Sequence, residues 1–159
     1  MAITYDALGT YNLNGLSSVT FSNISSAYTD LVIHYSGVAT AGTANGVGVR
    51  FNGDSTANYA WGYFESYTGT TQGVNQNGTS YALAGYMDND RSSGGTININ
   101  NYRGAFIKQI QSLGIGANSS VNNVTSWSST AAITSVTFFI LSNSFASPSV
   151  VSLYGIARA

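Results

Sequence analysis

The chain has 159 residues, a usual length for one domain with one hydrophobic core. Apolar residues make up 43 % of it but charged residues only 7 %, against roughly 25 % in average soluble domains. With a formal net charge of −1 and five Lys and Arg in total, the chain cannot neutralise many phosphates, which argues against a nucleic-acid partner. Cysteine is absent, which excludes disulfides and thiolate metal sites.

The N-terminal residues 1–6 lack the basic region and the apolar stretch of a signal peptide. No window of the chain approaches the ~20 apolar residues of a membrane span. We therefore expect synthesis in a cytoplasm and no membrane partner. The small net charge leaves little long-range repulsion between copies, which permits dense packing on a symmetric surface.

The hydrophobic pattern has a period of two along most of the chain, which is typical of strands. Leu31, Ile33 and Tyr35 share one face of an early strand, and residues 47–51 form a clean alternating strand that ends at the turn Asn52-Gly53-Asp54. In chain order, strands are expected near residues 19–24, 28–35, 47–51, 59–67, 81–87, 96–102, 106–115, 124–128, 133–141 and 150–156.

Two kinds of segment depart from this pattern. Residues 105–113 compete as a helix because three apolar residues have helical spacing, but an alternating pattern through Ile107 favours a strand. Residues 38–46 and 68–80 are small or polar, which predicts mobile loops.

These patterns predict an all-β fold. Regular strand spacing, a single proline and the lack of a convincing amphipathic helix favour an antiparallel, jelly-roll-like β-sandwich of about eight to ten strands. We expect one sandwich domain over residues 17–159, preceded by residues 1–16 as an N-terminal arm or an edge strand. If it is an arm, it reaches onto a neighbour through the apolar residues Ile3, Tyr5, Leu8, Tyr11 and Leu13.

The inventory of reactive side chains is too small for most enzymes. A Ser-His-Asp triad would need His34, which lies in the most apolar strand, and we expect it to be partly buried and bonded to a neighbouring strand or subunit. Glu65 and Asp54 are the one loosely suitable carboxyl pair for glycoside hydrolysis, but Asp54 is better explained as a turn residue. We expect no enzyme activity and no cofactor.

The loop Asp88-Asn89-Asp90 is the sharpest candidate for a metal site, since calcium prefers oxygen ligands. Counting from Asp88, Ser93 stands at the sixth position, where an EF-hand needs Gly, so that motif is excluded. We favour a solvated loop without metal, in which Arg91 neutralises one carboxylate.

Four aromatic residues, Tyr59, Trp61, Tyr63 and Tyr67, alternate along one predicted strand and would point to the same face. That face is either part of the core or a packed contact between subunits, and a platform for sugars is a third alternative. We take these residues, together with the apolar residues of the N-terminal segment, as the candidate interface.

Four segments carry a resemblance: Tyr28-Thr29-Asp30-Leu31-Val32-Ile33, Val49-Arg50-Phe51-Asn52-Gly53-Asp54 followed by Asn58-Tyr59, Ala132-Ile133-Thr134-Ser135-Val136-Thr137-Phe138, and Ser152-Leu153-Tyr154-Gly155-Ile156. Together they span most of the chain, which resembles the small virion proteins of tailed bacteriophages. The resemblance implies a jelly-roll module that serves as a capsid decoration (cement) protein or as a head or tail fibre domain, and is commonly trimeric. It implies no catalytic residues.

We therefore expect a virion protein on the particle surface. Its first expected role is to bind the outside of the major capsid protein shell as a homotrimer and to stabilise it. The chain starts at its own Met and lacks a coiled coil or repetitive shaft, which favours decoration over a fibre. The alternative is a receptor-binding module of a tail or head fibre that recognises carbohydrate on the host surface.

Overall fold

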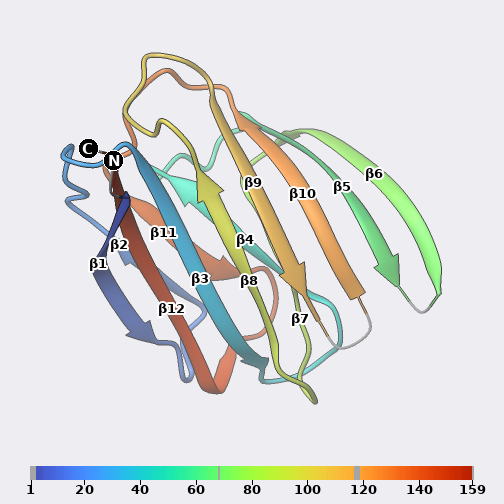
Figure 1. Ribbon diagram of the computed structural model, residues 1–159. Helices are drawn as coiled ribbons and strands as arrows, with labels where there is room; N and C mark the ends of the chain where they lie inside the picture. The colour runs from blue at the N-terminus through green and yellow to red at the C-terminus, as the bar shows by residue number, and fades with distance from the viewer. Residues whose placement is uncertain (1–2, 68, 117–118, 159) are drawn as a thin grey trace.

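The structure, a computed structural model, describes residues 3–67, 69–116 and 119–158. Within these residues every regular element is a strand, as predicted (Figure 1). The strands are β1 (Ile3–Asn12), β2 (Ser18–Phe21), β3 (Asp30–Ala39), β4 (Asn45–Phe51), β5 (Tyr59–Tyr67), β6 (Thr70–Thr79), β7 (Ala82–Met87), β8 (Ser93–Ile99), β9 (Lys108–Ile115), β10 (Ser119–Trp127), β11 (Val136–Ile140) and β12 (Phe145–Arg158).

The strands form two antiparallel sheets with the topology of a jelly roll. The large sheet has the order β1-β12-β3-β8-β9-β10-β5-β6, and the small sheet has the order β2-β11-β4-β7. The first four strands of the large sheet and the four of the small one reproduce the two sheets of a jelly roll. Along the chain these eight strands alternate between the sheets, except that β4 and β7 are neighbours in the small sheet. The predicted jelly-roll-like sandwich is therefore confirmed.

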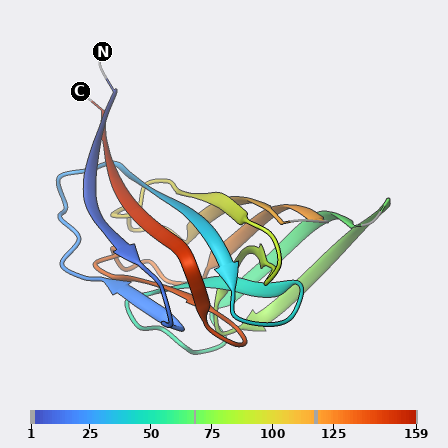
Figure 2. The ribbon, with the colours of Figure 1, turned by 90° about the horizontal axis from the view of Figure 1, so that it is seen from below.

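Two inserted hairpins enlarge one of the sheets. The hairpin β5-β6 lies between β4 and β7 in the chain, and β9-β10 lies between β8 and β11. Both hairpins join the large sheet beyond β8, so this sheet extends past the small one and ends at β6 (Figures 1 and 2). At the opposite edge of the large sheet, the first described residue, Ile3 on β1, pairs with the last, Arg158 on β12 (Figure 2).

The main core lies between the sheets and follows from the alternating pattern. In β4, Val47, Val49 and Phe51 are fully buried, and the neighbouring Arg50 is only partly buried. The ring of Tyr35 on β3 meets that of Phe138 on β11 at 5.2 Å between centroids, which joins the two layers. Val47, Val49 and Phe51 are the inward residues that the alternation of residues 47–51 predicts.

A second, smaller cluster fixes the inserted hairpins. Tyr63 on β5, Leu83 on β7 and Val121 on β10 are buried together beneath the extension. Polar groups reinforce this contact, because the carbonyl oxygen of Leu83 accepts hydrogen bonds from Asn123 Nδ2 at 2.7 Å and from Ser112 Oγ at 3.3 Å. Each of these buried donors thus has a partner.

The structure corrects the prediction of a mobile loop at residues 68–80, since Thr70–Thr79 is the edge strand β6. Almost all of its side chains are exposed, so it has no hydrophobic alternation that the sequence could reveal. Backbone pairing with β5 holds this strand in place instead. Residues 105–107 are irregular, and β9 begins at Lys108 as a strand rather than a helix. The described strands number twelve, more than expected.

The N-terminal segment is an edge strand rather than an arm. β1 pairs with β12 from Ile3↔Arg158 to Asn12↔Val150, with a register shift between Ala7 and Gly9. This ladder makes the segment part of the same sandwich, so the described chain forms one domain.

Candidate functional site: the outer face of the large sheet

The outer face of the large sheet, turned away from the small sheet, is uncharged over five strands. Antiparallel partners share a face, so the register identifies the outward residues. They are Gly94, Thr96 and Asn98 on β8, Gln109, Gln111, Leu113 and Ile115 on β9, Ser120, Asn122, Val124 and Ser126 on β10, Ala60, Gly62, Phe64 and Ser66 on β5, and Thr71, Gly73, Asn75 and Asn77 on β6. None of them carries a formal charge.

Four exposed apolar side chains interrupt this amide-rich surface. Leu113 is 50 % exposed, Ile115 59 %, Val124 58 % and Phe64 72 %. Leu113 and Phe64 both pair with Asn122, one from each side, and Val124 is the next outward residue on that strand. We call Phe64, Leu113, Ile115 and Val124 the apolar stripe, and such a patch on a soluble protein is typical of an interaction surface.

A shallow groove of about 460 Å³ lies beside the stripe. Its floor is low because Ala60 and Gly62 on β5 have almost no side chain, and Val124 of the stripe forms part of its lining. The amides of Asn75, Asn77 and Gln109 also line it. The groove thus offers hydrogen-bond donors and acceptors without charge.

The predicted aromatic set on β5 lies on the opposite, inner face. Tyr59 and Tyr63 are 1 % and 9 % exposed and belong to the two core clusters, so their assignment to a subunit interface is wrong. Trp61 is half-buried and stacks on Tyr63 at 5.7 Å. For Tyr67 only the backbone lies within the described part of the chain.

The apolar residues of the N-terminal segment divide into exposed and buried ones. Leu13 is fully buried, so it is not available to a neighbour, and the partly buried Leu8 packs against the core. Tyr5 is 58 % and Tyr11 41 % exposed, which leaves these two as candidate interface residues. For Ile3 the side chain lies outside the described part.

The candidate catalytic residues do not come together. His34 is exposed on the outer face, which corrects its predicted partial burial, and its Nδ1 lies 3.0 Å from Thr96 Oγ1 on the neighbouring strand β8. Glu65 is buried on β5 and accepts a 3.1 Å hydrogen bond from Gln72 Nε2. Asp54 follows the turn after β4, as expected, so it stabilises a local structure.

Asp54 is at the centre of a hydrogen-bond network. Its carboxylate accepts hydrogen bonds from the backbone N–H of Thr56 at 2.9 Å, from Asn58 Nδ2 at 2.9 Å and from Trp127 Nε1 at 2.7 Å. Hydrogen bonds from Thr56, Trp127 and Asn58 hold the pKa of this carboxyl well below its usual range.

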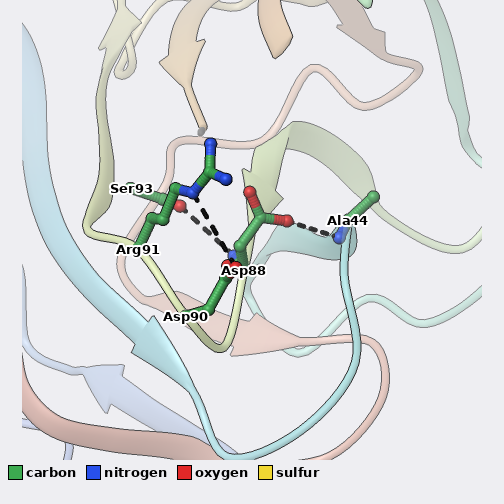
Figure 3. Close-up of polar contacts among 5 residues, drawn as sticks. All are labelled: Ala44, Asp88, Asp90, Arg91 and Ser93. Atoms are coloured by element: carbon green, nitrogen blue, oxygen red, sulfur yellow. Dashed lines mark hydrogen bonds and ion pairs between the residues drawn. The ribbon is translucent and has the colours of Figure 1, made fainter. Parts of the chain in front are cut away.

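The Asp88 loop has a structural explanation (Figure 3). Asp88 Oδ1 accepts a 2.6 Å hydrogen bond from the backbone N–H of Ala44, and its own N–H donates to Ser93 Oγ at 3.2 Å. Arg91 Nε lies 3.8 Å from Asp90 Oδ2, which is the ion pair expected from the sequence. Over residues 3–67, 69–116 and 119–158, no group of three or more His, Asp or Glu is arranged to hold a metal ion. The same residues contain no helix that is long and apolar enough to cross a membrane.

Comparison with known proteins assigns no family. No family model matches the chain, and no curated protein matches it. Among solved structures, the fructofuranosidase from Schwanniomyces occidentalis complexed with fructose is similar with a TM-score of 0.28 and 8 % sequence identity. The match covers 97 % of this chain and 34 % of that one, so the chain spans about a third of the enzyme's length. A similarity of this size carries no argument about function.

Proposed function

We propose that the chain is a non-enzymatic virion protein of a tailed bacteriophage, which binds the outside of the major capsid shell as a homotrimer and stabilises it. The observation that carries the proposal is the outer face of β8, β9, β10, β5 and β6, which is uncharged and bears the apolar stripe. Protein interfaces are depleted of charge and enriched in apolar and aromatic side chains at their centre. A jelly roll is also a common building block of viral shells.

The proposed mechanism is mechanical. Each copy places the apolar stripe against the shell or against a neighbouring copy around the trimer axis. A single contact of this size is weak, but many copies bound to one lattice hold it together by avidity. The net charge of −1 permits close packing of copies.

The experiment uses a double variant of the stripe, Leu113→Asn with Val124→Asn. Because both side chains are exposed, we expect the free energy of unfolding to change by less than about 0.5 kcal/mol per substitution. Binding of the purified protein to capsids that lack it is expected for the wild type and for the control Asn14→Gln, an exposed residue in the turn after β1, but not for the double variant. Equal binding by the double variant, or no binding by the wild type, would refute the proposal.

The groove beside the stripe favours a second candidate, binding of a neutral carbohydrate. Asn75, Asn77 and Gln109 can exchange hydrogen bonds with hydroxyl groups, and the exposed ring of Phe64 lies close by over Gly73. Aromatic rings stack on the apolar faces of sugars. The lack of charge would select neutral over anionic glycans.

A glycan array separates this candidate from the first. A carbohydrate-binding module would retain neutral glycans and would lose them on Phe64→Ala and on Ala60→Phe, which fills the groove. Capsid binding without retention of any glycan supports the decoration role alone.

A further inference from the structure

β6 is an edge strand of the large sheet. β6 pairs with β5 on one side and is last in the strand order, so no described strand pairs with its other side. Such an edge is a template for another strand, and proteins usually protect it with charged residues, proline, a bulge or a short length.

β6 has little of this protection. Thr70–Thr79 is ten residues long, contains no charged residue and no proline, and is almost wholly exposed. Its register with β5 is regular as far as Asn77, and the single shift, near Gly78 with φ of 67°, lies at the end of the strand. The edge is therefore long, regular and accessible.

The opposite edge of the same sheet differs. β1 contains Asp6, and its register shifts between Ala7 and Gly9 in the middle of the strand. A central bulge and an acidic residue are recognised means of discouraging edge pairing. Of the two edges, β6 is the one open to another strand.

The register defines which backbone groups of β6 are free. The N–H of Ser128, just after β10, donates to the carbonyl oxygen of Asn58, just before β5, at 2.8 Å. Every second residue of β5 from Ala60 therefore bonds β10, and the residues between them, up to Tyr67 opposite Thr70, bond β6. Hydrogen-bonded and non-hydrogen-bonded pairs then alternate along the ladder. The backbone groups that point outward therefore belong to Thr71, Gly73, Asn75 and Asn77, and those that bond β5 belong to Thr70, Gln72, Val74 and Gln76.

We propose that β6 pairs antiparallel with β6 of a second copy across a two-fold axis, which joins two large sheets into one. The strand is self-complementary, because its Asn and Gln amides both donate and accept hydrogen bonds. It is also uncharged, so two copies bring no like charges together. An identical patch on both partners is the requirement of a two-fold interface.

This contact goes beyond the proposed function and does not use the apolar stripe. With the stripe contact present, pairing at β6 links trimers to one another across two-fold axes of the shell. With the stripe contact removed, the same pairing leaves a dimer. The double variant Leu113→Asn with Val124→Asn therefore isolates the β6 contact, whatever the stripe binds.

The first test is sedimentation of further variants in that double-variant background. Asn75→Pro removes an outward N–H and leaves the hydrogen bonds to β5 intact. We expect the background protein and the control Asn75→Ala to form a dimer, and the Asn75→Pro protein to be a monomer. A monomeric background protein at hundreds of micromolar, or a dimer that survives Asn75→Pro, would overturn the proposal.

A second measurement needs no substitution in β6. Amide hydrogen exchange in the double-variant background should be roughly tenfold or more slower at high than at low concentration for Gly73 and Asn75. The amides of Gln72 and Val74, which already bond β5, should not respond to concentration. Equal exchange of Gly73 and Asn75 at both concentrations would overturn the proposal even if Asn75→Pro failed to fold.

Discussion

The indole Nε1 of Trp127 donates a 2.7 Å hydrogen bond to Oδ2 of Asp54, across 73 positions of the chain. Trp127 is 2 % exposed and stacks on Tyr59 at 6.3 Å, and the hydroxyl of Tyr59 donates to the carbonyl oxygen of Asp54 at 3.2 Å. The turn after β4 is thereby fixed to the end of β10. One carboxylate thus connects the jelly roll to an inserted hairpin.

We expect Asp54→Ala to lower the free energy of unfolding by about 2–4 kcal/mol, because it leaves the buried Trp127 N–H without its acceptor and removes hydrogen bonds to a charged group. Urea denaturation at neutral pH measures this. The control Asp90→Ala, at an exposed carboxylate, should change stability by less than about 1 kcal/mol. Similar losses for the two variants would contradict the role of Asp54.

The same network predicts how stability depends on acid. The pKa of Asp54 is lower in the folded protein than the usual 3.8, so the unfolded chain takes up a proton at higher pH than the folded one. The stabilisation is fully present above about pH 5 and is lost as the pH falls through and below the usual value. Asp54→Asn should lose less stability between neutral pH and pH 2 than the wild type. Parallel curves for the two proteins would exclude Asp54 as the cause.

Buried tyrosines predict a loss of stability in alkali. Burial raises the pKa of Tyr59 to about 12, and burial also raises that of Tyr35 well above its usual range. The tyrosines of the unfolded chain ionise near their usual pKa of 10.0, so the stabilisation is present below that pH and is lost as the pH rises through the folded-state pKa. Absorbance titration should show that a group of tyrosines ionises together at a pH above their usual pKa, as the protein unfolds. Titration of every tyrosine near pH 10 without unfolding would contradict this burial.

Gly95 packs so closely against Tyr35 that the addition of one methyl group there is predicted to lower the stability of the fold. A Cβ on Gly95 would lie 2.6 Å from the hydroxyl of Tyr35 and would overlap the backbone carbonyl of Leu113. We expect Gly95→Ala to destabilise the fold by about 3 kcal/mol or more, since the backbone must move. A Cβ on Gly73 has its nearest neighbour at 3.6 Å, so Gly73→Ala should change stability by less than about 1 kcal/mol. Thermal unfolding compares the two.

Much of the fold follows from the sequence because one face of most strands is buried. Residues 47–51 alternate cleanly, and Asn52 and Gly53 adopt φ of 54° and 70°, as their turn requires. The sequence predicts β6 and β10 poorly for one common reason. β6 buries almost nothing, and in β10 the buried residues include the polar Asn123 and Thr125, whereas the apolar Val124 faces outward. Alternation of apolar residues therefore indicates neither strand correctly.

The candidate site was harder to predict, because the type of an apolar residue does not show whether its side chain is exposed or buried. Tyr59 and Tyr63 on β5 are core residues, whereas Phe64, one position away on the same strand, is 72 % exposed. Only the register of β9, β10 and β5 shows that Leu113, Val124 and Phe64 share a face. A strand's two faces cannot be assigned to core and surface without its neighbours.

A reconstruction of the virion whose genome encodes this chain tests the central claim most directly. The account predicts copies on the outside of the capsid shell, around three-fold axes, with Leu113 and Val124 covered by the shell or by a neighbouring copy. Particles that lack the chain, or that carry it only at the tail with the outer sheet face open to solvent, would contradict it.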